Sequence, residues 1–396
     1  MPSIKAFFSA AAATGLLAAN PASTRAEPPT IASGEAPASD FARFAPRQNA
    51  TTTRLDFAVF DEALKFMVLS MYQSTREGLG RPAPGLGTNL TYGHTSRYRL
   101  EGNRIVFSYL EPEQIAPLTE YRQDLEQIGT QIDIASLPRN EQLAYWLNLH
   151  NVAVIEQIAV NYPVRSPSRM KLGADKTPLD TTRFINVDGV AMSPRDIRTK
   201  IVFPNWSDPN VIYGFFRGEI GGPSIQRRAY TGDNVTELLT NSAVEFVNSL
   251  RGIEAFGSNL LVSKIYEEAA PFYFPDMGAD FRQHILVHAR EDVAELVDRK
   301  SGIKFNAYED DVADLAGGKR EPTYNEVVTD NGSNGQTVQS FRVPQSVART
   351  LGERAQKIEK LRREGLLRGR VIVLPQPGET EQTQETAPQS PENEDE

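Results

Sequence analysis

Apolar positions recur at helical spacing in several parts of the chain. Residues 54–72 place Leu55, Val59, Phe66 and Met67 along one face, which predicts an amphipathic helix. The same periodicity, with Pro or small polar residues at the starts, predicts four further helices. They are expected at 112–129, 194–202, 233–250 and 280–299.

Residues 140–160 form the most apolar helical segment. Asn140 is a plausible N-cap, and Pro163 ends the segment. The apolar residues occupy nearly every face, which is typical of a helix buried on all sides. This segment is therefore expected to be the central helix of the core.

Alternating residues predict a few short strands. Residues 96–110 and 183–192 each suggest a hairpin, the second around the turn pair Asp188-Gly189. Residues 211–217 suggest a strand that runs into the Gly-Gly-Pro-Ser turn at 221–224. The expected fold class is α+β: a mostly helical single domain with a small antiparallel sheet and one buried central helix.

The two ends differ from the middle. Lys5, the apolar run at 6–19 and the small residues before a cleavage point after Ala26 predict a signal peptide over 1–26. A Pro/Ala/Ser-rich linker is expected at 27–50. The rest divides into a domain at 51–318, a linker at 319–345, a basic helix with a short strand at 346–375 and a disordered acidic tail at 376–396.

The composition excludes several kinds of reactive site and argues against one class of partner. The 396 residues carry a net charge of −9 and no cysteine. The acidic balance argues against a nucleic-acid partner, and the missing thiols exclude disulfides, thiolate metal sites and a cysteine nucleophile. No segment is expected to span a membrane. The signal peptide predicts a periplasmic or secreted protein, and no cofactor is expected.

Several segments resemble the bacterial domain-of-unknown-function 547 family over about residues 54–300. The likeness rests on IVFSYLEPEQIAPLTEYRQDLEQI, RNEQLAYWLNLHNVAVI and INVDGVAMSPRDIRTKIV, and on the stretch from Asp208-Pro209 through GGPS. SKIYEEAAPFYFPD at 263–276 matches a further segment. The family has no established reaction, so the resemblance implies a fold more than an activity.

The resemblance also implies a loss of reactive groups. Relatives usually carry a histidine in the strand matching 211–215 and a Ser-Cys-Pro at the matching turn. This chain has Tyr213 and Gly222 at those positions. A thiolate–imidazole pair at that corner is therefore impossible here, and the chain is expected to be a divergent member.

Polar residues inside the apolar helix are the first candidate site. Asn148 and Asn151 lie three apart and share a face, with His150 beside them. They could bind a ligand, or they could tie the helix to loop backbone, as most buried amides do. His150 is also a candidate catalytic base.

The Gly-Gly turn is the second candidate. Gly221 and Gly222 allow close approach of a ligand to the backbone, and Arg217 and Tyr213 lie nearby as further ligand-binding candidates. Ser224 and Glu219 are the candidate nucleophile and acid–base group. No Gly-x-Ser-x-Gly motif surrounds the serine, so a plain tight turn is the alternative.

His284 and His288 lie four apart on one expected helix and are a weak candidate for a metal site. On a single helix over 280–299, the stripe of Phe281, Ile285 and Val293 points away from both histidines. We therefore expect the pair on the solvent side and predict no metal site.

The basic segment 347–370 is the last candidate. Between 353 and 370 it has seven Lys or Arg against three Glu. Such a helix can bind an anionic membrane surface, or it can pack Leu351, Ile358 and Leu361 on the domain.

Three functions remain open: a non-catalytic binding or scaffold module with an unknown envelope ligand or protein, a hydrolase or transferase on an envelope substrate, and a membrane-surface adaptor.

Overall fold

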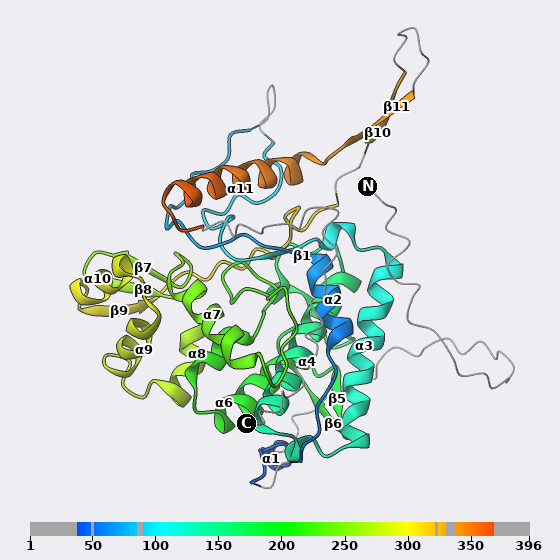
Figure 1. Ribbon diagram of the computed structural model, residues 1–396, viewed down its shortest axis with the longest axis vertical. Helices are drawn as coiled ribbons and strands as arrows, with labels where there is room; N and C mark the ends of the chain where they lie inside the picture. The colour runs from blue at the N-terminus through cyan, green and yellow to red at the C-terminus, as the bar shows by residue number, and fades with distance from the viewer. Residues whose placement is uncertain (1–37, 49–50, 85–89, 321–323, 330–336, 368–396) are drawn as a thin grey trace, which may run out of the picture.

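The computed structural model describes residues 38–48, 51–84, 90–320, 324–329 and 337–367. The expected signal peptide, the acidic tail and the strand after residue 370 lie outside these residues. Helices are the main regular secondary structure of the described chain (Figure 1). The α-helices are α1 (Ala38–Ala42), α2 (Ala58–Met67), α3 (Pro112–Gln131), α4 (Arg139–Val160), α5 (Pro194–Asp196), α6 (Phe203–Asn205), α7 (Val235–Val247), α8 (Ile265–Tyr273), α9 (Asp280–His288), α10 (Glu291–Arg299) and α11 (Gln345–Arg363).

Helix α4 is the centre of the core, as the sequence predicts. It begins at Arg139 after Pro138 rather than with Asn140 as N-cap. Nearly all of its side chains are buried, including the charged Glu156. Arg122 of the neighbouring α3 neutralises that carboxylate, with its Nε atom 2.6 Å from Oε2. A paired and hydrogen-bonded charge is the form in which a carboxylate is tolerated inside a core.

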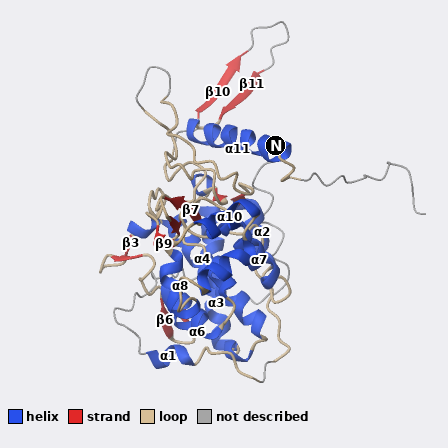
Figure 2. Ribbon diagram, turned by 90° about the vertical axis from the view of Figure 1, so that its left-hand side faces the viewer, coloured by secondary structure: helices blue, strands red, loops and turns tan. Residues whose placement is uncertain are grey.

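The strands are short and scattered around the helices (Figure 2). Four two-stranded antiparallel sheets are present among the described residues, plus one three-stranded sheet in which β8 and β9 are parallel. The class is therefore α+β. The strands are β1 (Val68–Leu69), β2 (Arg104–Ile105), β3 (Lys171–Leu172), β4 (Thr177–Pro178), β5 (Ile185–Val187), β6 (Val190–Met192), β7 (Ile253–Phe256), β8 (Asn259–Val262), β9 (Gly302–Phe305), β10 (Tyr324–Thr329) and β11 (Thr337–Arg342).

Two predicted strand elements are wrong. Residues 96–110 do not form a hairpin: β2 pairs with β1, more than thirty residues earlier. Residues 211–217 do not form a strand, because Asp208 and Pro209 start the 3-10 helix η6 (Pro209–Gly214). The Asp208 side chain accepts a hydrogen bond from the Asn210 N–H, as a helix cap does.

The hairpin at 183–192 is confirmed. Strands β5 and β6 meet at Asp188 and Gly189, which both adopt positive φ angles of 49° and 78°. Positive φ at both turn positions is what a two-residue hairpin requires. The following helix start is confirmed too, because the Ser193 side chain accepts from the Asp196 N–H.

Helix α11 lies across one end of the described residues between 38 and 320, which we call the body (Figure 1). Its Lys357 Nζ donates to the Leu100 carbonyl at 2.7 Å, and Arg354 Nε donates to the Ser70 carbonyl at 2.7 Å. Glu353 accepts two hydrogen bonds from Arg99. Before α11, the segment expected as a linker contains the β10–β11 hairpin. None of the helices in the described ranges is long and apolar enough to cross a membrane.

Candidate functional site: a basic groove

The two amides of α4 bind backbone. Asn148 Nδ2 donates to the Tyr230 carbonyl at 2.7 Å, and its Oδ1 accepts from the Tyr230 N–H at 3.0 Å. Asn151 makes the same pair of contacts with the Gly214 carbonyl and the Phe216 N–H, both at 2.9 Å. Each amide thus forms hydrogen bonds with one backbone N–H and one backbone carbonyl of a loop that is not paired with a strand.

His150 lies between an amide and a guanidinium. Its Nδ1 is 3.1 Å from Asn151 Oδ1, and its Nε2 is 3.0 Å from Arg198 Nη1. Because Asn151 Oδ1 only accepts and Arg198 only donates, the contacts assign the proton to Nδ1. Burial and the charge of Arg198 lower the pKa of His150 to about 3. The imidazole is therefore neutral, with its lone pair engaged.

Arg198 organises a buried charge network. Its guanidinium binds Asp180 through two hydrogen bonds of 2.8 Å and Glu268 through two of 3.0 Å. Burial opposes ionisation of Glu268, but Arg217 and Arg198 outweigh it and lower the pKa of Glu268 to about 2. Arg217 joins the network through Glu268. The network therefore holds Arg217 in place, and Arg217 lines a hollow described below.

The Gly-Gly turn packs against the loop that follows β9. The Gly221 N–H donates to the Glu309 carbonyl at 2.9 Å. A Cβ atom on Gly221 would lie 2.7 Å from that carbonyl oxygen, and one on Gly222 would lie 2.9 Å from the Tyr308 hydroxyl. Glycine is therefore required at Gly221, where the close atoms are backbone, whereas a side chain at Gly222 would displace the Tyr308 hydroxyl.

Glu219 sits just before the turn. Its Oε1 accepts a hydrogen bond from the Ser168 N–H at 2.7 Å. Burial nevertheless raises the pKa of Glu219 to about 7. A carboxyl group with such a pKa can exchange a proton near neutral pH.

Ser224 contacts a carboxylate and not a histidine. Its Oγ donates to Glu245 Oε2 at 3.0 Å and accepts from Arg251 Nη2 at 3.0 Å. Arg251 is itself paired with Glu245 at 2.6 Å. The serine residue is only 8% exposed.

The prediction that His284 and His288 face solvent is wrong, since each residue is only 8% exposed. The expected helix over 280–299 is broken between α9 and α10, so Phe281 and Val293 lie on different helices. A single apolar stripe through both residues therefore does not exist, and it could not define the solvent side. His284 Nε2 is 2.8 Å from the Tyr213 hydroxyl, and the two rings stack. Burial and the neighbouring His288 lower the pKa of His284 to about 4.

The predicted residues therefore contact separate partners. Asn148 binds Tyr230, Tyr213 binds His284, and Ser224 binds Glu245. Of the candidates, Arg217 lines one of the hollows described next. Three consecutive acids, Glu309 to Asp311, bring their carboxylates within 4.8 Å of one another.

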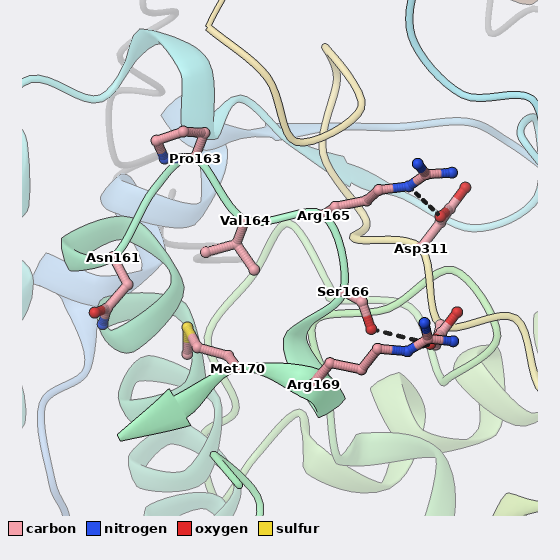
Figure 3. A pocket seen from close by; sticks show the side chains of 9 residues that line it. Asn161, Pro163, Val164, Arg165, Ser166, Arg169, Met170 and Asp311 are labelled. Carbon is pink, nitrogen blue, oxygen red and sulfur yellow. Dashed lines mark hydrogen bonds and ion pairs between the residues drawn. The ribbon is translucent and has the colours of Figure 1, made fainter. Parts of the chain in front are cut away.

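A hollow of about 700 Å³ lies between the loop after α4 and the loop after β9 (Figure 3). Arg165 Nε is 3.6 Å from Asp311 Oδ1, and Arg169 Nε is 2.7 Å from Asp310 Oδ2. The Val312 N–H donates to the Arg165 carbonyl at 2.8 Å, which fixes the two walls together. The hollow is lined by Asn161, Pro163, Val164, Arg165, Ser166, Arg169, Met170, Asp310 and Asp311.

Two further hollows adjoin the first. One of about 510 Å³ shares Arg169 and Asp310 with it, and another of about 300 Å³ shares Arg165 and Asp311. The shared residues place the three hollows in a row, which we call the basic groove. Its charged lining residues are six cations and two carboxylates: Arg81, Arg165, Arg169, Arg217, Lys264, Lys319, Asp310 and Asp311.

Sequence reasoning missed most of this groove. The available signals were Arg165 and Arg169, set among Pro and Ser directly after the buried helix, and the acidic run at 309–311. Charged residues in loops after core elements are typical of binding sites. Nothing local, however, indicated that two segments about 145 residues apart would form opposite walls.

Comparison with known proteins gives one family. Residues 134–247 match the family model described as "Protein of unknown function, DUF547". This confirms the resemblance over that segment, which includes α4 and the Gly-Gly turn. No match to a curated protein or to a solved structure was found.

Proposed function

We propose that this chain, whose residues 134–247 belong to the DUF547 family, is an exported, non-catalytic binding module of the bacterial envelope. The proposal places its ligand in the basic groove. The observation that carries it is the row of three hollows in which Arg165 and Arg169 are each held by an aspartate. Both arginine side chains are largely exposed beside the hollow, so their remaining N–H donors can reach a ligand.

The corner that the resemblance assigns to reactive groups supports a non-catalytic role. Tyr213 stands where relatives carry a histidine, and its hydroxyl is engaged by His284. Gly222 stands where they carry a cysteine, and it is covered by Tyr308. His150 offers no free lone pair, because Arg198 donates to its Nε2.

A hydrolase or transferase is the second candidate, and one contact favours it. Ser224 Oγ lies 3.0 Å from Glu245, which is within reach of a general base. Against it, Arg251 binds both groups, and Ser224 lines none of the three hollows of the basic groove.

The membrane-surface adaptor draws less support from α11. Lys357 and Arg354 bind carbonyls of the body, and Lys360 pairs with Glu77. Lys357 and Arg354 are therefore engaged while the helix is docked, so fewer cations of α11 remain for lipid. Liposome flotation tests this function: a chain that ends at residue 345 should float no less than the full chain.

The binding proposal is tested with three soluble probes: tetragalacturonate, chitotetraose and a disaccharide–pentapeptide fragment of cell wall. At least one probe should raise the melting temperature, since a ligand of the native state stabilises it. Arg169→Glu should abolish the shift, and mass spectrometry should recover the probe intact. A probe that is converted by the wild type but not by Ser224→Ala would establish the hydrolase instead, and no Arg169-dependent shift with any probe would refute the proposal.

A further inference from the structure

The charge of the basic groove is opposite to that of the whole chain. The lining residues contribute six cations against two carboxylates, whereas the full sequence carries a net charge of −9. A local reversal of this kind focuses a positive potential along a cleft and attracts an anionic ligand. The groove therefore differs from an ordinary solvated surface.

Several of the cations are available to a ligand. The Arg165 and Arg169 side chains are 75% and 78% exposed, and Lys264 and Lys319 are exposed as well. Lys264 makes no ion pair within the described part of the chain. Arg217 lines the same hollow as Lys264; its side chain is 20% exposed and is paired with Glu268. The end hollow thus offers the free ammonium group of Lys264 beside a partly exposed guanidinium.

The groove also offers acceptors. Asp310 and Asp311 lie where adjacent hollows meet, and Ser166 donates to Asp310 at 3.0 Å. Carboxylates accept hydrogen bonds from hydroxyl groups, but they repel phosphates and other carboxylates at close range. A fitting ligand therefore carries both acidic groups and hydroxyl groups along its length.

The shape indicates an extended ligand. Each of the three hollows has a volume within the range of small-molecule sites, and shared residues connect them in a row. Among the residues that line the three hollows, Tyr308 is the one Phe, Tyr or Trp. Single-stranded nucleic acids are usually bound on several stacking aromatic side chains, so this lining does not fit them.

We infer that the basic groove binds an acidic polysaccharide, a sugar chain with repeated carboxylate groups. This inference rests on the proposed binding function and adds the ligand class. The carboxylates bind the row of Arg and Lys side chains, with Lys264 and Arg217 at one end. The sugar hydroxyls donate to Asp310 and Asp311 between them.

Isothermal titration of the full chain tests the inference with tetragalacturonate, neutral chitotetraose and linear tetraphosphate. Tetragalacturonate should bind most tightly, and its affinity should fall as salt is raised from 50 to 300 mM because added ions screen exposed charges. The double variant Arg169→Glu/Lys264→Glu should weaken binding at least about tenfold by reversing two charges. Arg228→Glu, an exposed arginine that lines none of the three hollows, should change it by less than about twofold.

The outcomes separate the two proposals. Chitotetraose binding that depends on Arg169, without tetragalacturonate binding, overturns the acidic-glycan inference but leaves the binding function intact. Tighter binding of tetraphosphate, or tetragalacturonate affinity unchanged in the double variant, also overturns the inference. No binding of any probe overturns both proposals. Unchanged thermal melts of the variants show that they are folded, as expected for exposed positions.

Discussion

At the residue scale, the polar side chains of α4 act on loop backbone, and Asn148 gives the clearest test. Replacing it with alanine leaves the Tyr230 N–H and carbonyl without partners in a fully buried place. Each unpaired group costs about 1–3 kcal/mol. We expect Asn148→Ala to lower the free energy of unfolding by at least about 2 kcal/mol in urea titrations.

The matched control is Gln123→Ala on the exposed face of α3. A change within about 0.5 kcal/mol is expected there, as for most surface positions. Equal effects of the two substitutions would show that the Asn148 contacts do not hold the loop.

Glu219 gives a pH-dependent prediction. Its pKa in the folded protein is raised to about 7, above the ordinary value of 4.5. Between these pH values the folded protein retains a proton that the unfolded chain has released, so its contribution to stability is lost as pH rises. Glu219→Gln removes this dependence. The variant should therefore gain stability relative to wild type from pH 5 to pH 7, by up to about 1.4 kcal/mol per unit.

Urea titrations of both proteins at pH 5, 6 and 7 measure this difference. Glu237→Gln, on the exposed side of α7, should keep the wild-type pH dependence. A constant difference between Glu219→Gln and wild type over this range would mean that Glu219 is ionised in the folded protein throughout.

Residue roles were predictable where burial alone decides them. Asn148 and Asn151 lie on one face of an apolar helix, so an amide-to-backbone role followed from the cost of burying an unpaired amide. The environment of His284 did not follow, because it depends on Tyr213 from a distant segment and on the break after His288. The Arg165 and Arg169 pairs were equally unpredictable, since their aspartates come from another loop.

At the scale of elements, α11 is held to the body largely by polar contacts. Single substitutions of the residues that make these contacts should therefore weaken its docking. Lys357 is buried and donates to the Leu100 carbonyl. Losing a buried hydrogen bond worth about 1.4 kcal/mol raises local opening about tenfold. We expect Lys357→Ala to speed amide hydrogen exchange over residues 345–363 by that factor, as measured by mass spectrometry.

Arg363→Ala on the same helix is the control, because Arg363 is exposed and its loss should leave exchange unchanged. Exchange within α4 should be unaffected in both variants. Equal protection of α11 in Lys357→Ala and wild type would show that the buried amine does not hold the helix.

Elements with strong local signals were predicted well, and those shaped by distant contacts were not. Helix α3 and the β5–β6 hairpin have their capping or turn residues within the segment itself, and α4 is marked by apolar residues on nearly every face. The apolar run at 211–217 has the composition of a strand. It instead forms η6, where Asn151 satisfies the Gly214 carbonyl and the Phe216 N–H. A helix side chain thus takes the place of a neighbouring strand.

At the scale of the whole molecule, one apolar core extends from Phe41 to Ala313 and contains both Trp146 and Trp206. Helix α11 lies outside this cluster, and its Val347 belongs to a small separate one. A core of this extent should unfold cooperatively even without the terminal helix. The body and α11 are therefore expected to be separable in stability.

The last prediction follows from that separation. A chain ending at residue 344 should keep a single tryptophan-fluorescence transition in urea, coincident with the loss of far-ultraviolet circular dichroism. Its midpoint should be lower than that of the full chain, because Lys357 and the buried Leu361 no longer cover the body. A chain ending at residue 367 retains α11 and should match the full chain. If the shorter chain lost its cooperative transition, α11 would be an integral part of the core, and the basic groove could not be regarded as a property of the body alone.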